Sequence, residues 1–264
     1  MRPILPAFLI SLGFLFQSQM ASSQPPMSKG EWTYNNEKPE SVTFVFGTAL
    51  TAQEIDQLSS YASLTRIVMG NAGVDSECVV VEGDFSKLGR LTRLEDVHLC
   101  IDALNDDDLK FSARLQKLRT LEFNADNGYD DIHEVPICTD RCADHIGSAE
   151  TLRSLVIHDG QFTDQFVARI TDGLPKLEEL SLNSAELTDE SLRLLAERCK
   201  NLKSLSIASD HFTAKGLKHL DKLQHLEMRS VSSPALRKKK NPKEISKLLG
   251  RGNTCPRSMT ESQW

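Results

Sequence analysis

Aromatic residues make up only 6% of the 264-residue sequence, which argues against a large ligand pocket lined by aromatic rings. Positive charge is not in excess either: 31 Lys and Arg stand against 37 Asp and Glu, and the formal net charge is −6. That overall charge gives no reason to expect a nucleic acid as partner. The chain also lacks a C-x-x-C pair and the G-x-S-x-G, H-E-x-x-H and phosphate-loop motifs. We therefore expect no metal site, no cofactor and no catalytic residue.

The chain begins with the pattern of a secretory signal peptide. Arg2 supplies the positive charge, Ile4 to Phe16 form an apolar run, and Ala21-Ser22-Ser23 fits the cleavage site. The run of about 13 residues is too short to span a membrane as a helix, although an uncleaved anchor or a buried N-terminal helix stays an alternative. We predict a signal peptide over residues 1–23 and a secreted or periplasmic protein. After cleavage we expect no membrane span.

The cysteines leave two interpretations open. An even number in an exported chain permits disulfides, whereas irregular spacing and positions within apolar patterns favour buried thiols. The sequence has six cysteines, which are Cys78, Cys100, Cys138, Cys142, Cys199 and Cys255. Cys138 and Cys142 are four residues apart, and no pair has the spacing of a zinc ribbon.

A repeated motif predicts the architecture. The string L-x-x-L-x-apolar recurs every 21 to 34 residues, and its leading residues are Leu64, Leu94, Leu118, Leu152, Leu177, Leu202 and Leu223. Val42, Phe44 and Phe46 form a weaker first copy. Most copies are followed by an apolar residue and a helix-capping residue, at Thr51, Asn105, Thr139, Thr163, Thr188 and Thr213. Each copy therefore predicts a strand, a loop and a helix, and stacked copies bury one continuous core.

These motifs resemble the leucine-rich repeat family. The segment from Cys199 through Leu202, Leu205 and Ile207 to Thr213 is similar to the cysteine-containing, ribonuclease-inhibitor-like subtype. The resemblance implies an α/β solenoid of about eight repeats, a right-handed superhelix with parallel strands on the concave face and helices on the convex face. One position departs from the family: the usual Asn or Cys of the loop is replaced by Asp102, Asp126, Gly160, Ala185 and Asp210. We therefore expect the buried asparagine ladder of the family to be missing.

Four segments follow from this assignment. Residues 1–23 are the signal peptide, 24–40 an N-terminal linker, 41–230 the solenoid and 231–264 a basic C-terminal cap or tail. Residues 70–86 and 124–137 lengthen two repeats, and the second insertion is acidic without the spacing of an EF-hand. The last segment holds eight Lys and Arg against two Glu, which suits a terminal cap or a contact with a polyanion.

The residues between the apolar strand positions predict the concave face. Because alternate side chains of a strand point to opposite faces, these residues line the inner curve, which is polar and slightly acidic. The partner-binding candidates are Asp96, His98, Glu122, His158, Glu179, Asn183, His225 and Glu227. The face contains no Trp or Tyr, so we expect an unknown protein or a polar or glycan partner rather than a tight apolar interface.

Three functions remain open from the sequence. The first is an exported, non-enzymatic scaffold that binds proteins through the concave face. The second, implied by the cysteine-type repeat, is an intracellular adaptor resembling a ubiquitin-ligase substrate receptor, or an enzyme inhibitor. The third is an enzyme or a structural protein. An enzyme is considered because Asp96, His98, Cys100 and Glu122 lie on adjacent predicted strands, where His98 could contact Glu122. A shallow open curve excludes water poorly, so we do not favour the enzyme.

Overall fold

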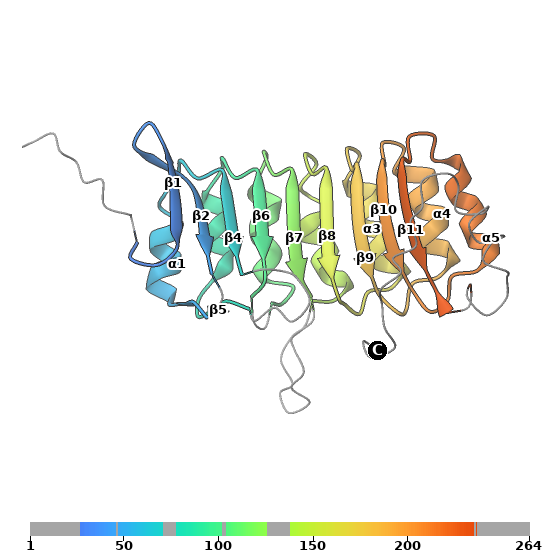
Figure 1. Ribbon diagram of the computed structural model, residues 1–264, viewed down its shortest axis with the longest axis horizontal. Helices are drawn as coiled ribbons and strands as arrows, with labels where there is room; N and C mark the ends of the chain where they lie inside the picture. The colour runs from blue at the N-terminus through green and yellow to red at the C-terminus, as the bar shows by residue number, and fades with distance from the viewer. Residues whose placement is uncertain are drawn as a thin grey trace, which may run out of the picture.

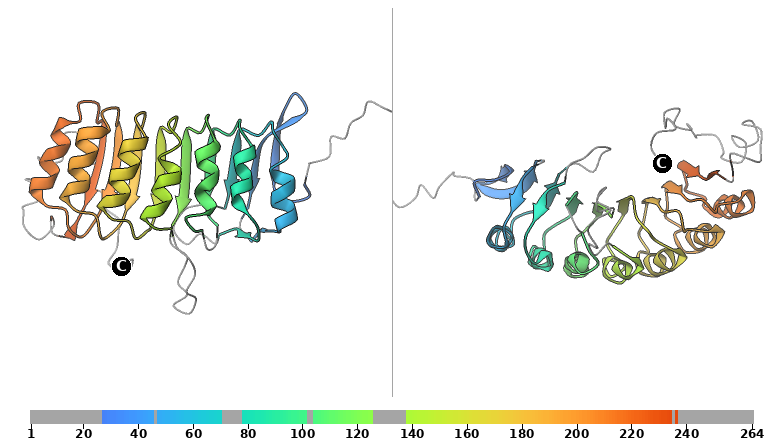
Figure 2. Two further views of the ribbon diagram at one scale, coloured as in Figure 1. Left: turned by 180° about the vertical axis from the view of Figure 1, so that it is seen from behind. Right: turned by 90° about the horizontal axis from the view of Figure 1, so that it is seen from below.

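The protein forms a curved sheet backed by short helices, as the computed structural model shows (Figure 1). The structure describes residues 27–45, 47–70, 78–101, 104–125, 138–234 and 236. The predicted signal peptide, Cys255, residues 71–77 of the first insertion, residues 126–137 of the second and most of the basic C-terminal segment lie outside the described residues. Viewed along its edge, the sheet lines the inner side of an arc and the helices lie along the outer side (Figure 2).

Nine strands build the main sheet, in the order β1-β2-β4-β6-β7-β8-β9-β10-β11. β1 pairs with β2 in antiparallel fashion, whereas each later neighbour along the sheet is parallel. The strands are β1 (Glu31–Asn35), β2 (Lys38–Phe44), β4 (Arg66–Met69), β6 (Asp96–Leu99), β7 (Thr120–Asn124), β8 (Ser154–His158), β9 (Glu179–Asn183), β10 (Ser204–Ala208) and β11 (Met228–Ser232). Two short strands, β3 (Ala49–Leu50) and β5 (Val80–Val81), pair separately.

The convex side carries one helical segment for each repeat. The α-helices are α1 (Ala52–Leu58), α2 (Ala143–Ile146), α3 (Asp164–Gly173), α4 (Asp189–Arg198) and α5 (Ala214–Leu217). The 3₁₀ helices are η1 (Phe85–Arg90), η2 (Asp108–Arg114), η3 (Asp140–Cys142) and η4 (Lys218–Lys222). The two longest α-helices, α3 and α4, have 10 residues each and lie in the most regular repeats, whereas two of the earlier repeats carry the 3₁₀ helices η1 and η2.

The core is a stack of apolar rows that run across the strands. Leu121, Leu155, Leu180 and Leu205 are register neighbours on β7 to β10, and each is fully or almost fully buried. Each such side chain contributes roughly 1.5–3 kcal/mol of apolar burial relative to exposure. Each repeat contributes one leucine to this row and cannot bury it alone. The stack is therefore stable only when neighbouring repeats cover one another.

The predicted caps are present, and they connect one repeat to the next. Thr163 and Thr188 accept hydrogen bonds from the backbone N–H two residues further along, as N-caps of α3 and α4. The aspartate that follows each cap accepts from the cap of the next repeat: Asp164 Oδ1 and Oδ2 accept from the backbone N–H and the hydroxyl of Thr188, at 3.0 and 2.6 Å. Asp106, Asp140 and Asp189 repeat this contact. We call these contacts the Asp–Thr ladder.

Buried serines stand one residue before two of the loop positions that lack the family's asparagine, Ala185 and Asp210. Ser184 Oγ accepts from Phe162 N–H at 2.9 Å and donates to the Phe162 carbonyl at 2.7 Å. Ser209 Oγ donates to the Ala185 carbonyl at 2.9 Å and accepts from His211 N–H at 3.1 Å. Both serines follow directly after a strand. Their hydroxyl groups make the hydrogen bonds to the loop backbone that the amide of an asparagine would otherwise make.

Two boundaries differ from the sequence expectation. Part of the segment assigned to a linker forms β1 and the start of β2, whose hairpin covers the first edge of the sheet. The last strand is also shifted, because Met228 rather than His225 pairs with Ser204. Arg229 and Val231 consequently take the core positions beside Leu205 and Ile207, and Met228 is exposed. Among the described residues no strand follows β11, so no further repeat fixes the register of this last strand through its apolar motif.

Candidate functional site

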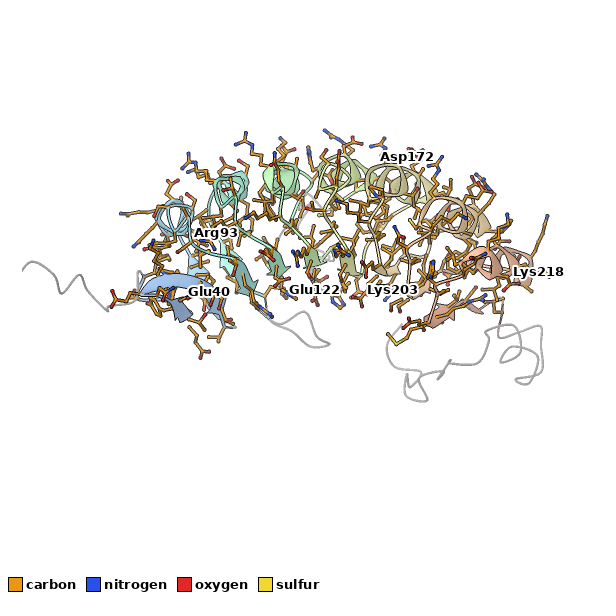
Figure 3. The ribbon with its side chains drawn as sticks, turned by 90° about the horizontal axis from the view of Figure 1, so that it is seen from above. Glu40, Arg93, Glu122, Asp172, Lys203 and Lys218 are labelled. Atoms are coloured by element: carbon orange, nitrogen blue, oxygen red, sulfur yellow. The ribbon has the colours of Figure 1, made fainter. Side chains whose placement is uncertain are left out.

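The strand register brings three of the predicted residues together near the middle of the concave face. His98 on β6 and Glu122 on β7 are direct register neighbours. His158 on β8 is paired with Asn124, two residues further along β7 than Glu122. Since alternate residues share one face of a strand, all three side chains project from the concave side. Figure 3 shows Glu122 on the strand side and Asp172 on the helix side of the arc.

The three side chains form a continuous hydrogen-bonded unit, the His98–Glu122–His158 cluster. His98 Nδ1 lies 2.6 Å from Glu122 Oε2, and His158 Nε2 lies 2.9 Å from Glu122 Oε1. One carboxylate thus accepts from an imidazole on either side. The side chains of His98, Glu122 and His158 are 25, 24 and 33% exposed. They are therefore ordered by one another while remaining open to a partner.

The two histidines stabilise the charged form of the carboxylate. Hydrogen bonds from His158 and then from His98 lower the pKa of Glu122 to about 2, although burial opposes the effect. The same contact raises the pKa of His158, against the opposing effect of burial. A carboxylate with so low a pKa is a weak proton acceptor near neutral pH, so the cluster is poorly suited to general-base chemistry at Glu122.

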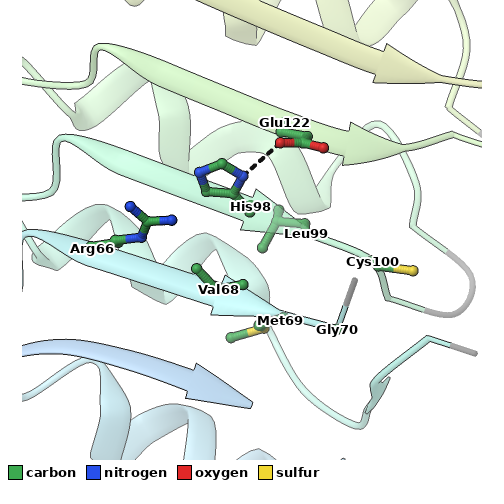
Figure 4. Close-up of a pocket in the computed structure, with 8 residues that line it drawn as sticks. All are labelled: Arg66, Val68, Met69, Gly70, His98, Leu99, Cys100 and Glu122. Carbon is green, nitrogen blue, oxygen red and sulfur yellow. Dashed lines mark hydrogen bonds and ion pairs between the residues drawn. The ribbon is translucent and has the colours of Figure 1, made fainter. Parts of the chain in front are cut away.

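A shallow cavity of about 220 Å³ lies beside the cluster, toward the first repeats. Arg66 and Val68 of β4, together with His98 and Glu122, form its walls, and Gly70 and Cys100 lie at the carboxyl ends of the strands (Figure 4). The exposed guanidinium of Arg66 makes this side of the cluster cationic. Arg66 and Gly70 were not among the predicted site residues. Arg66 could have been predicted from the sequence, because the repeat aligns it with Asp96, its register neighbour on β6.

The other predicted site residues lie apart from the cluster. Asp96 sits one column away on β6, and Glu179 of β9 accepts from Ser154 Oγ at 2.8 Å. Asn183 is exposed at the end of β9. His225 and Glu227 are exposed and precede β11, so they do not continue the predicted concave columns. The shifted register puts Met228 and Ser230 there instead.

Within the described part of the chain, one other group has metal-binding side chains close together. Asp106, Cys138 and Cys142 bring their ligand atoms within 4.8 Å of one another. Asp106 is already engaged in the Asp–Thr ladder, where it accepts from Thr139. Cys138 and burial hold the pKa of the Cys142 thiol far above its usual range, so that thiol stays protonated. The geometry therefore matches a capping contact inside the core.

Comparison with known proteins agrees with the repeat architecture. A family profile described as FBD-associated F-box protein At5g56370, LRR repeats, matches residues 110–237. The structure of internalin C2 from Listeria monocytogenes superposes with a TM-score of 0.52 at 17% identity, covering 74% of each chain. The chain is a leucine-rich repeat protein. This repeat protein is also similar, at 14% identity and a TM-score of 0.40, to the LRR ectodomain of the plant receptor kinase GASSHO1/SCHENGEN3 from Arabidopsis thaliana in complex with CASPARIAN STRIP INTEGRITY FACTOR 2.

That second likeness covers 75% of this repeat protein and 24% of the receptor chain. No curated protein sequence matches the repeat protein. None of its described helices is long and apolar enough to cross a membrane. The internalin C2 structure therefore supports the fold of an α/β solenoid, and the partner has to be inferred from the concave face itself.

Proposed function

We propose that this leucine-rich repeat protein is an exported, non-enzymatic scaffold that binds a protein, or a polar or glycan partner, through its concave face. The observation that carries the proposal is the His98–Glu122–His158 cluster, which is ordered and open on the inner curve. Binding to a prearranged polar group needs less ordering of side chains than binding to mobile ones. The low pKa of Glu122 and the shallow cavity support binding rather than turnover.

A charge reversal tests the concave face. We would immobilise the full mature chain and recover partners from the extracellular or periplasmic fraction, comparing the wild type with Glu122→Arg. Glu150→Arg is the matched control, because Glu150 is an exposed glutamate in the loop before β8. The proposal predicts a partner that is retained by the wild type and the control and lost with Glu122→Arg. Equal recovery by all three proteins would place the binding surface elsewhere.

The exported location rests on the signal-peptide pattern at the start of the sequence. Cleavage near residue 23 predicts a mature protein that begins close to Gln24. Mass spectrometry of the protein isolated from its natural source would identify the first residue directly. An intact Met1 on a cytosolic protein would contradict the exported scaffold without affecting the repeat fold.

The second candidate is an intracellular adaptor or inhibitor. The match of residues 110–237 to the repeats of an F-box-protein family favours this alternative. Both functions use the same concave face, so the charge reversal does not separate them. The compartment does, and the N-terminal measurement decides between the two.

A further inference from the structure

Two cysteines that are distant in the sequence are held side by side where β6 ends and β5 is about to begin. Cys78 precedes β5, and Cys100 follows β6. The backbone N–H of Val79 donates to the Cys100 carbonyl at 2.8 Å, and Val79 and Ile101 form a parallel bridge. These contacts join the main chains that carry the two cysteines.

The sulfur atoms are in direct contact. Cys78 Sγ and Cys100 Sγ are 2.6 Å apart, which is closer than two thiol groups need to be for a hydrogen bond. Cys100 also packs closely against Gly70, which has φ +68°: a Cβ there would lie 2.9 Å from the Cys100 carbonyl oxygen and 3.0 Å from its Cβ. The chain thus packs closely against Cys100 on the side of Gly70.

We propose that Cys78 and Cys100 form a disulfide that ties the end of β6 to β5 beside the concave cavity. The main-chain bridge brings the two side chains together before any bond forms, which is the condition for closing a disulfide without backbone movement. Cys100 lines the cavity that also contains His98 and Glu122. The bond therefore fixes one wall of the candidate site. It requires no partner molecule, and it stands independently of the proposed function.

The other described cysteines are poor competitors for oxidation. Cys199 is buried within the apolar core, and burial raises the pKa of its thiol to about 12. Cys138 and Cys142 are completely buried. By contrast, Cys78 is partly exposed. Thiol–disulfide exchange needs both a thiolate and access, so Cys78 is the entry point.

The exchange is balanced with a low-molecular-weight disulfide of the glutathione class. The Cys78 thiolate attacks one sulfur of oxidised glutathione, forms a mixed disulfide and releases one glutathione thiolate. The Cys100 thiolate then attacks Cys78 Sγ and releases the second glutathione. The protein loses two protons and two electrons, and the glutathione disulfide is reduced to two thiols. An oxidising extracytoplasmic compartment favours this product, whereas a reducing cytosol opposes it.

Peptide mapping without reduction tests the bond on the full-length protein. We would equilibrate the purified chain in a buffer of oxidised and reduced glutathione, block remaining thiols by alkylation, and digest it. The proposal predicts one linked pair of peptides that contains Cys78 and Cys100 and is lighter than the two free peptides by two hydrogen atoms. Complete alkylation of both residues, or a link from either one to a different cysteine, would overturn it.

Thermal unfolding of variants supplies a second readout. A bond that closes a loop with a sequence separation of 22 residues should raise the melting temperature of the oxidised protein by about 5–10 °C over the reduced protein. Cys78→Ser and Cys100→Ser should both abolish this difference, and Cys199→Ser should keep it. Cys78 is partly exposed, so Cys78→Ser is expected to fold even where Cys100→Ser does not. A difference that persists in Cys78→Ser would refute the pairing.

Discussion

Replacing Glu122 with glutamine should remove a charge-dependent part of the stability of the concave face. The wild-type carboxylate accepts one hydrogen bond from His98 and one from His158. Glutamine keeps the shape of the side chain and one acceptor oxygen, but its amide nitrogen is a donor and faces an imidazole N–H. The variant should fold, because neither apolar burial nor strand register changes. The expected loss is therefore confined to the cluster.

The magnitude follows from the pKa of Glu122. A fall from the ordinary value of 4.5 to about 2 corresponds to about 3 kcal/mol, at about 1.4 kcal/mol for each pKa unit. The side chain is 24% exposed, and solvent weakens such contacts, so we expect the loss in Glu122→Gln to be about 2 kcal/mol.

The shifted pKa values determine how the stability of the cluster changes with pH. Because the pKa of Glu122 is lowered in the folded protein, its stabilising effect is complete above about pH 4.5 and disappears as the pH falls toward 2. The pKa of His158 is raised, so its effect is present below 6.5 and disappears as the pH rises through its folded-state value. Both effects overlap between about pH 4.5 and 6.5. The wild type should exceed Glu122→Gln in stability most in that interval.

Urea unfolding followed by circular dichroism measures this difference. We would compare the wild type, Glu122→Gln and the exposed control Glu150→Gln at pH 5.5 and at pH 3. The free-energy difference between the wild type and Glu122→Gln should fall by more than half at pH 3, while the control stays within about 0.5 kcal/mol of the wild type. A difference that is the same at both pH values would show that the cluster does not stabilise through its charge.

Three further substitutions test the repeat architecture by urea unfolding. Asp164→Ala removes the acceptor of the Asp–Thr ladder at the cap of α4 and should cost about 2–3 kcal/mol, whereas the exposed control Asp210→Ala should cost under about 0.5 kcal/mol. Gly216→Ala places a Cβ against the side chain of Asp189 and should destabilise the protein by about 1–3 kcal/mol; an unchanged unfolding midpoint would contradict this crowding. Arg229→Leu should be neutral or stabilising by about 1 kcal/mol, because Nε of this buried side chain has no hydrogen-bond partner among the described residues; a marked loss would contradict the register of β11.

The sequence predicted the repeats well because periodic burial determines the fold. The apolar motif fixes the face of each strand, and parallel register then places equivalent residues side by side. The contact between His98 and Glu122 follows from that rule and is confirmed at 2.6 Å. The contact between His158 and Glu122 was not predictable, because the two residues are not register neighbours. It depends on the length and rotation of the side chains.

The contacts between repeats were less visible in the sequence. The Asp–Thr ladder is marked in the sequence by the dipeptide Thr-Asp, which begins at Thr139, Thr163 and Thr188. The dipeptide alone does not predict the contact, because the contact depends on the distance between neighbouring helices. The last strand was misplaced for a related reason. A motif that matches Leu223 and Leu226 carries information only when another repeat covers the same row, and no described strand follows β11.

The candidate site lies beside the least regular repeats of the solenoid. The most regular part of the solenoid, from β8 to β10, presents mainly small serine side chains in its central columns, such as Ser181 and Ser206. The cavity, His98 and Glu122 lie between the two insertions, where Gly70 and Cys100 adjoin the strand ends, and His158 joins them from the neighbouring strand β8. Identical stacking needs only small polar residues on the inner curve, so a cluster of histidine and carboxylate is not required by the fold. The cluster lies beside the two insertions, and the equivalent positions on β9 and β10 have no such cluster. This is the physical reason to look for the partner at Glu122.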